Sequence, residues 1–143
     1  MNRSRAILFG AAVALAGILA PVVAFASGGG EVSTFTKWVT TPPNMAGIVG
    51  GAAGDGTYAG EVLMMTTGPT TVIEALYHFK GAAHSFTVLM HVEQTGLKAV
   101  LTGVVTEGWM KGSPVKGEFT QITSPKAPGD GTAYQGTVTM LGS

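Results

Sequence analysis

The stretch that decides the fold reads TVIEALYHF over residues 71–79 and HSFTVLMHVEQ over residues 84–94. Along both segments apolar side chains recur at every second position, which is typical of half-buried β-strands. A tight turn at Gly81-Ala82 would join the two strands as a hairpin and would pair Tyr77 with Phe86. The apolar residues of both strands then lie on the same side, as a half-buried hairpin requires.

The chain continues from this hairpin into a third strand through a second turn. A tight turn at Thr95-Gly96 would pair Val92 with Ala99 on the apolar side and Glu93 with Lys98 on the other side. The second pair joins opposite charges across the strands, which favours this register. The two turns independently predict one shared inner face.

Further strands are indicated before and after these three, separated by glycine- and proline-rich turns. The apolar, glycine-rich stretch at residues 45–53 is left unassigned. The chain has 22 glycines and only 11% charged residues, and no segment has a convincing helical pattern. We therefore predict an all-β domain, an antiparallel up-and-down β-barrel of seven to eight strands, with a two-sheet β-sandwich as the alternative. The expected strands cover residues 32–39, 57–66, 71–79, 84–94, 98–105, 115–122 and 132–141.

The N-terminus has the pattern of a secretory signal peptide. Two arginines precede an apolar run over residues 6–20, and Ala24-Phe25-Ala26 supplies the small residues that signal peptidase accepts. The run is shorter than the roughly 20 residues that a membrane-spanning helix needs. We predict a signal peptide at residues 1–26, a flexible leader at 27–31 and one barrel domain at 32–143. The protein would then be secreted or periplasmic, with no membrane contact after cleavage.

The charge pattern after residue 26 excludes several classes of partner. Six lysines and no arginine stand against eight acidic residues, and there is no cysteine. Specific nucleic-acid binding requires clustered cationic side chains, so we expect no nucleic-acid partner. Without cysteine the domain has neither disulfides nor a thiolate metal site. The composition leaves homo-oligomerisation open.

One short motif occurs twice, as Gly54-Asp55-Gly56-Thr57 and as Gly129-Asp130-Gly131-Thr132. Calcium binds six to eight oxygen ligands, and each copy offers a single carboxylate. We therefore interpret the repeat as the reuse of one turn type before a strand.

Two stretches carry a family resemblance. The sequences GDGTYAG at residues 54–60 and GVVTEGWMKGSPVKGEF at residues 103–119 resemble small β-barrels of the allene oxide cyclase-like type, together with related uncharacterised bacterial secreted barrel domains. The resemblance covers the chain from about residue 54 onward. It implies a barrel with an apolar cavity, in which some relatives steer the cyclisation of a reactive apolar substrate. It assigns no catalytic residue to this chain.

No recognisable catalytic motif is present, such as a nucleophile elbow, a phosphate-binding loop or a zinc-protease helix. Two residues remain as catalytic candidates. His84 is expected at the end of the apolar face, near the mouth of the barrel, where an imidazole could act as an acid or a base. Glu107 would point inward if its strand stays regular, whereas a bulge at Gly108 would place it in solvent, which is the arrangement we expect.

The histidines do not predict a metal site. His78 and His91 are expected on the outer face together with Glu74 and Glu93, but with Glu74 opposite Leu89 the two histidines lie roughly six residue rows apart at the ordinary strand rise. We predict no metal and no cofactor.

The function that the sequence favours is the non-catalytic binding of a small apolar ligand inside the barrel. A cofactor-free cyclase or isomerase using the same cavity is the first alternative. The second is a structural or interaction module with a filled core, whose outer strip would contain Leu76, Leu89 and Val100. The residues expected to line the interior are Ile73, Tyr77, Phe86, Met90, Leu101, Trp109 and Phe119.

Overall fold

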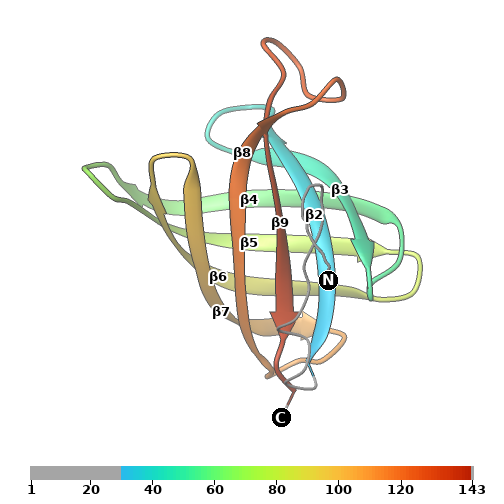
Figure 1. The fold of residues 1–143 in the computed structure, drawn as a ribbon. Helices are drawn as coiled ribbons and strands as arrows, with labels where there is room; N and C mark the ends of the chain where they lie inside the picture. The colour runs from blue at the N-terminus through green and yellow to red at the C-terminus, as the bar shows by residue number, and fades with distance from the viewer. Residues whose placement is uncertain (1–29, 143) are drawn as a thin grey trace, which may run out of the picture. The chain divides into compact units, whose positions relative to one another are not determined.

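The computed structural model describes residues 30–142, and these form a closed antiparallel β-barrel of eight strands (Figure 1). Each strand pairs with the next along the chain, and the last strand pairs with the first. The prediction of an all-β up-and-down barrel is confirmed. The predicted signal peptide lies outside the described residues. The strands are β2 (Glu31–Val39), β3 (Met45–Gly51), β4 (Gly56–Thr66), β5 (Thr71–Gly81), β6 (Ser85–Thr95), β7 (Lys98–Gly108), β8 (Pro114–Thr123) and β9 (Thr132–Met140).

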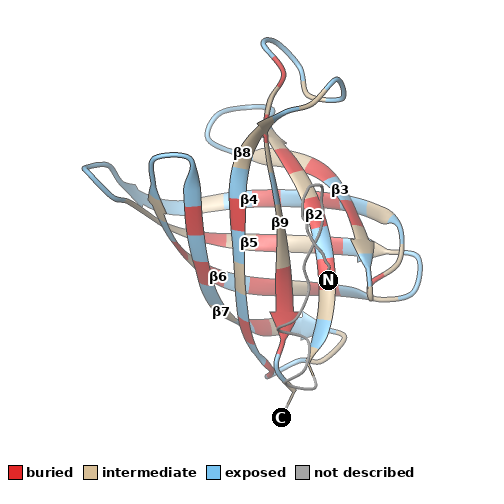
Figure 2. Cartoon of the chain, viewed as in Figure 1, coloured by how far each residue is buried: buried red, intermediate tan, exposed pale blue. Residues whose placement is uncertain are grey.

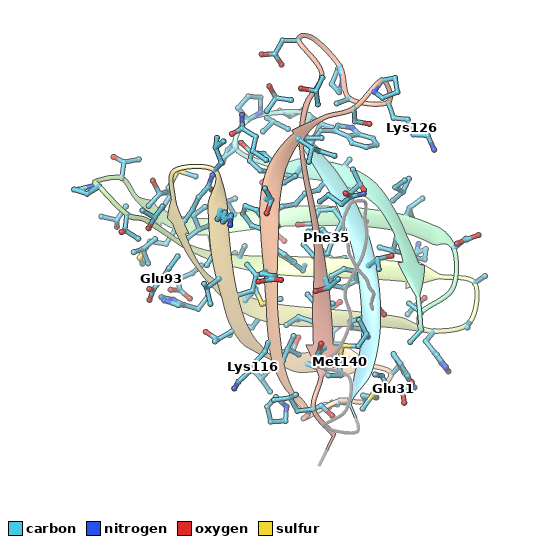
Figure 3. The ribbon with its side chains drawn as sticks, viewed as in Figure 1. Glu31, Phe35, Glu93, Lys116, Lys126 and Met140 are labelled. Atoms are coloured by element: carbon cyan, nitrogen blue, oxygen red, sulfur yellow. The ribbon has the colours of Figure 1, made fainter. Side chains whose placement is uncertain are left out.

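The core fills the inside of this barrel. Along the strands buried and exposed residues alternate, as the colour bands of Figure 2 show. Phe35 lies inside the barrel, whereas Glu93 and Lys116 lie on its outer side (Figure 3). The largest buried side chains, each less than 2% exposed or close to it, are Phe35, Phe79, Met90, Leu101 and Met140.

The first hairpin has the predicted faces in a different register. Phe79 pairs with Phe86, and Tyr77 pairs with Val88, so the predicted pairing of Tyr77 with Phe86 is wrong. The turn is two residues longer because the backbone amides of Ala82 and His84 donate to carbonyls of the β3–β4 connection. A shift of two residues returns every side chain to the same face, so the inner face is preserved.

The second hairpin shows the same two-residue shift. Its turn centres on Gly96, at a φ of 62°, and the following leucine, and Thr95 pairs with Lys98. Glu93 therefore lies opposite Val100, and the predicted ion pair between Glu93 and Lys98 is wrong. Glycine at Gly96 accommodates the left-handed conformation that shapes this turn.

The unassigned stretch at residues 45–53 contains strand β3, which pairs with β2 on one side and β4 on the other. Its composition is explained by close packing of the backbone. A Cβ atom on Gly47 would lie 1.9 Å from the carbonyl oxygen of Thr36. Only glycine fits there, so the run of side chains that would show a strand is interrupted at Gly47.

Two irregularities interrupt the ladder. In β7 the register shifts at Thr106, between the pairs Val88–Val105 and Thr87–Glu107. The predicted irregularity near the end of β7 is therefore present, but it lies at Thr106 and not at Gly108. In β4 the register shifts at Leu63. The residues after this second shift, Met64 and Met65, are exposed.

The two copies of the glycine-aspartate motif differ in their backbone. The first glycine has a positive φ in both copies, 84° at Gly54 and 67° at Gly129, but of the second glycines only Gly131 does. The interpretation as one reused turn type is therefore wrong in detail. Asp130 accepts a hydrogen bond from the amide of Thr132 at 2.9 Å, and this hydrogen-bonding lowers the pKa of its carboxyl.

Candidate functional site

A lysine lies inside the barrel. The alternation of β2 sends Ser33, Phe35 and Lys37 inward, and all three are buried. Lys37 is only 3% exposed, although lysine is among the residues least often buried. Its Nζ atom donates a hydrogen bond of 2.6 Å to the hydroxyl oxygen of Tyr77 on β5.

Aromatic rings surround the amine of Lys37. The Nζ atom lies 4.2 Å from the ring centroid of Phe119 and 4.5 Å from that of Tyr77. The rings of Phe35 and Tyr134 follow at 5.8 and 5.9 Å. Ring faces attract a cation, so these contacts partly replace the water that a lysine loses on burial. The walls of the site are otherwise apolar.

Burial changes the acid–base chemistry of this amine. Desolvation lowers the pKa of Lys37 from 10.5 to about 7. Among residues 30–142 the buried polar and charged side chains are Ser33, Lys37, Ser113 and Thr139, so no buried carboxylate accompanies the amine. A substantial fraction of Lys37 is therefore uncharged near neutral pH, and an uncharged lysine is both a hydrogen-bonding group and a nucleophile.

A second polar group lies next to this site. Tyr58 on β4 is 3% exposed, and within the described part of the chain its hydroxyl has no hydrogen-bond partner. Its ring packs edge-on against that of Tyr77, with 5.2 Å between the centroids. Burial is the main cause that raises the pKa of Tyr58 and of Tyr77 above the usual tyrosine value, so both hydroxyls stay protonated and can donate. The Tyr77 hydroxyl lies near enough to raise the pKa of Tyr58 further, but the two hydroxyls form no hydrogen bond with each other.

The space around the Tyr58 hydroxyl depends on a glycine in the same strand. A Cβ atom on Gly60 would lie 2.4 Å from the hydroxyl oxygen of Tyr58. Any side chain at this position would displace the phenol ring. The glycine therefore keeps the unpartnered hydroxyl in its place inside the barrel.

The predicted lining residues all belong to the core or pack against it. Ile73, near the start of β5, and Trp109, in the turn after β7, are partly buried and pack against the core. Only Tyr77 and Phe119 of the predicted set contact Lys37. The fully buried ones are Tyr77, Phe86, Met90, Leu101 and Phe119.

The two catalytic candidates lie away from Lys37. His84 stacks on Trp109, with 4.0 Å between the ring centroids and 4° between the planes, and Trp109 packs edge-on against Phe86. His84 belongs to the β5–β6 connection, at the opposite end of the barrel from the β2–β3 connection that follows Lys37. Glu107 is exposed on β7.

The outer face carries a small ionic cluster. The observed register pairs Glu74 with His91, so the expected pairing of Glu74 with Leu89 is wrong. His91 bonds Glu74 through Nδ1 at 2.5 Å and Glu93 through Nε2 at 2.9 Å. Hydrogen bonds to Glu93 and Glu74 raise the pKa of His91 above 6.5. Its two ring nitrogens contact different carboxylates, so the protonated ring can donate one hydrogen bond to Glu74 and one to Glu93.

The other histidine of the outer face lies apart from this cluster. His78 contacts the hydroxyl of Thr87 at 3.0 Å through Nδ1, and its Nε2 lies 3.9 Å from Glu61. Over residues 30–142 no group of three or more acidic or histidine side chains is arranged to hold a metal ion.

The predicted outer strip is present in part. Leu76 pairs with Leu89, and Leu89 pairs with Val104, which gives an apolar row across β5, β6 and β7. Val100 is exposed but lies further along β7, opposite Glu93.

In the described part of the chain no helix is long and apolar enough to cross a membrane.

Neither Lys37 nor Tyr58 was predicted from the sequence as a site residue. The signal for Lys37 was available, because the alternation that buries Phe35 also points the residue two positions later inward. A lysine at such a position is assigned to solvent by its type and to the core by its place in the strand. The place in the strand decided the outcome.

The chain matches no family model, no curated protein and no solved structure. The relationship to allene oxide cyclase-like barrels therefore stays a prediction that rests on the two glycine-rich stretches. The assignment of a site rests on the geometry around Lys37.

Proposed function

We propose that the barrel interior binds a small, predominantly apolar molecule whose single polar group is held by Lys37 and Tyr58. The observation that carries this proposal is unused hydrogen-bonding capacity inside an apolar core. The amine of Lys37 has one hydrogen-bond partner, and the hydroxyl of Tyr58 has none among the described residues.

The energetics favour a binding role over a purely structural one. A buried polar group without a partner costs about 1–3 kcal/mol, and the core could avoid that cost with Met and Phe at the two positions. A ligand oxygen that accepts from both groups would recover much of this cost on binding. Groups of this kind fix the orientation of a ligand in a pocket that is otherwise apolar.

The surroundings of Lys37 indicate what kind of molecule fits. The rings of Phe35, Tyr77, Phe119 and Tyr134 would contact the ligand body, so it should be apolar, with aromatic or unsaturated character. Tyr134 is the partly buried ring of this set and also packs edge-on against Phe119, at 5.3 Å. We propose that movement of Tyr134 opens the route to Lys37.

The alternative of a cyclase or isomerase built on His84 and Glu107 has less support. Neither residue contacts Lys37 or Tyr58, and Glu107 is exposed. Binding needs only the polar groups that the interior contains.

The proposal is tested by native mass spectrometry of the purified protein, before and after exposure to an extract of apolar metabolites. A reproducible non-protein mass on the folded protein is expected, with reduced occupancy in Lys37→Met and in Tyr58→Phe. Lys116→Met, which removes an exposed lysine, is the matched control and should bind as the parent does.

A protein that stays unliganded in all these samples would overturn the proposal. An unliganded mass at twice the monomer value would instead support the interaction module. The outer row of Leu76, Leu89 and Val104 would then be the surface to mutate.

A further inference from the structure

We propose that Lys37 captures an apolar aldehyde or ketone as an imine, formed between its Nζ atom and the carbonyl carbon of the ligand. This inference rests on the proposed function, since the ligand must first occupy the barrel interior, and it names the chemical class of that ligand. Two features of the site support it, and the step balances with the groups that the interior supplies.

The first feature is that no buried carboxylate among residues 30–142 pairs with the amine, so only ring faces and one phenol oxygen favour its protonated form. The described residues include no buried carboxylate, and the contacts of Lys37 are a phenol hydroxyl and four aromatic rings. A lysine attacks a carbonyl carbon only when its lone pair is free. Desolvation by an apolar environment is one of the established ways to free that lone pair near neutral pH, and the pKa of about 7 agrees with it.

The second feature is the pair of tyrosine hydroxyls. The hydroxyl of Tyr77 accepts a hydrogen bond from the amine. The ring of Tyr58 packs against Tyr77, and the hydroxyl of Tyr58 makes no hydrogen bond to another described residue. A carbonyl oxygen placed against Tyr58 would receive a hydrogen bond that polarises it toward attack. Donors arranged around a developing oxyanion stabilise the addition step.

The reaction itself needs only water-free surroundings and proton transfer. The nitrogen lone pair forms a bond to the carbonyl carbon, and the carbonyl oxygen gains a proton to give a carbinolamine. Both protons originally on the neutral amine leave with that oxygen as one molecule of water, and a C=N bond remains. No oxidant, reductant or metal is required, and exclusion of bulk water favours the imine.

The test uses 2-naphthaldehyde as the probe and 2-naphthalenemethanol as its non-carbonyl counterpart. The purified protein is incubated with each compound at pH 7 in the presence of sodium cyanoborohydride, which converts an imine to a stable secondary amine. Peptide mapping then locates the added mass. We expect Lys37 to be labelled at least tenfold faster than any exposed lysine, because burial lowers the pKa of the Lys37 amine from 10.5 to about 7.

Two variants separate the chemistry from folding. Lys37→Met should lose the fast labelling, whereas Lys116→Met should retain it. Tyr58→Phe keeps the amine and removes only a hydroxyl that has no partner among the described residues, so it should fold and should label several-fold more slowly.

The outcomes distinguish this inference from the function on which it rests. If the aldehyde and the alcohol both bind without covalent attachment to Lys37, the imine is wrong and the binding function stands. If neither compound binds and labelling is spread over exposed lysines, the inference is overturned and the binding function loses its support from this probe class.

Discussion

The Nζ atom of Lys37 lies 2.6 Å from the hydroxyl oxygen of Tyr77, three strands away in the order of the barrel. The contact joins β2 to β5 through the interior and not along the sheet. It is a polar link between two distant parts of the chain in a mostly apolar core. Its strength can be measured, and so can the cost of burying the amine.

Stability should rise with pH between about 7 and about 10, above which ionisation of Tyr58 and Tyr77 in the unfolded chain opposes the rise. In the unfolded chain the amine of Lys37 holds its proton up to about 10.5, and in the folded protein it loses the proton near 7. Unfolding within this window therefore takes up a proton, and the free energy of unfolding increases by up to about 1.4 kcal/mol per pH unit. Chemical denaturation at several pH values measures the slope.

The control for that slope is Lys37→Met, which has no titrating group at this position. Its unfolding free energy should lack the steep rise, and at pH 7 the variant should be more stable than the parent. A parent protein whose stability is flat from pH 7 to 10 would show that the amine keeps its proton inside the barrel.

The contact between Lys37 and Tyr77 should give a measurable coupling energy. Tyr77→Phe removes the one hydrogen bond that the amine makes among residues 30–142 and should destabilise the protein by about 1–3 kcal/mol. In the Lys37→Met background the same substitution should cost less, because the phenol then has no amine to lose. A double-mutant cycle by urea denaturation measures the difference, and additive effects would mean that the two groups are not coupled.

His91 should titrate above pH 6.5. Its ring nitrogens bond Glu93 and Glu74, which favours the protonated ring in the folded protein. The stabilisation is then present below pH 6.5 and is lost as the pH rises through the folded pKa. NMR titration of the ring protons measures this pKa, and Glu93→Gln should lower it. An unchanged value in that variant would argue against the Nε2 contact.

Gly47→Ala should destabilise the barrel by about 2 kcal/mol or more, because its Cβ atom would overlap the carbonyl oxygen of Thr36 at 1.9 Å. Gly68→Ala is the matched control. It lies in the exposed β4–β5 connection, where the nearest atom to an added Cβ is 3.6 Å away. Thermal unfolding of both variants checks the comparison, and equal melting temperatures would contradict the close packing at β3.

The sequence predicted the barrel because side-chain alternation is a local property that the fold preserves. The pairing register of the first hairpin could not be predicted from the sequence. The turn after Gly81 is lengthened by backbone contacts with the β3–β4 connection, which lies some thirty residues earlier in the chain. Strand β3 was also hidden, because Gly47 is selected by the neighbouring backbone and has no side chain to show the pattern.

Of the residues that surround Lys37, only the aromatic ones were predicted in part from the sequence. Tyr77 and Phe119 follow from their apolar faces, but an aromatic residue in a core and one in a binding site look alike in a sequence. The alternation of β2 indicates that Lys37 points inward with Phe35, but the extent of its burial follows only from the pairing of β2 with β9, which closes the ring.

Glu31 pairs with Met140 where β2 meets β9. The two ends of the barrel segment therefore lie beside each other, and a short linker between them would make this part of the chain circular without disturbing any strand. New termini could then be opened in the exposed connection around Gly68. Such a circular permutant should keep the same eight strands and the same interior, since the ring has no strand at which it must begin.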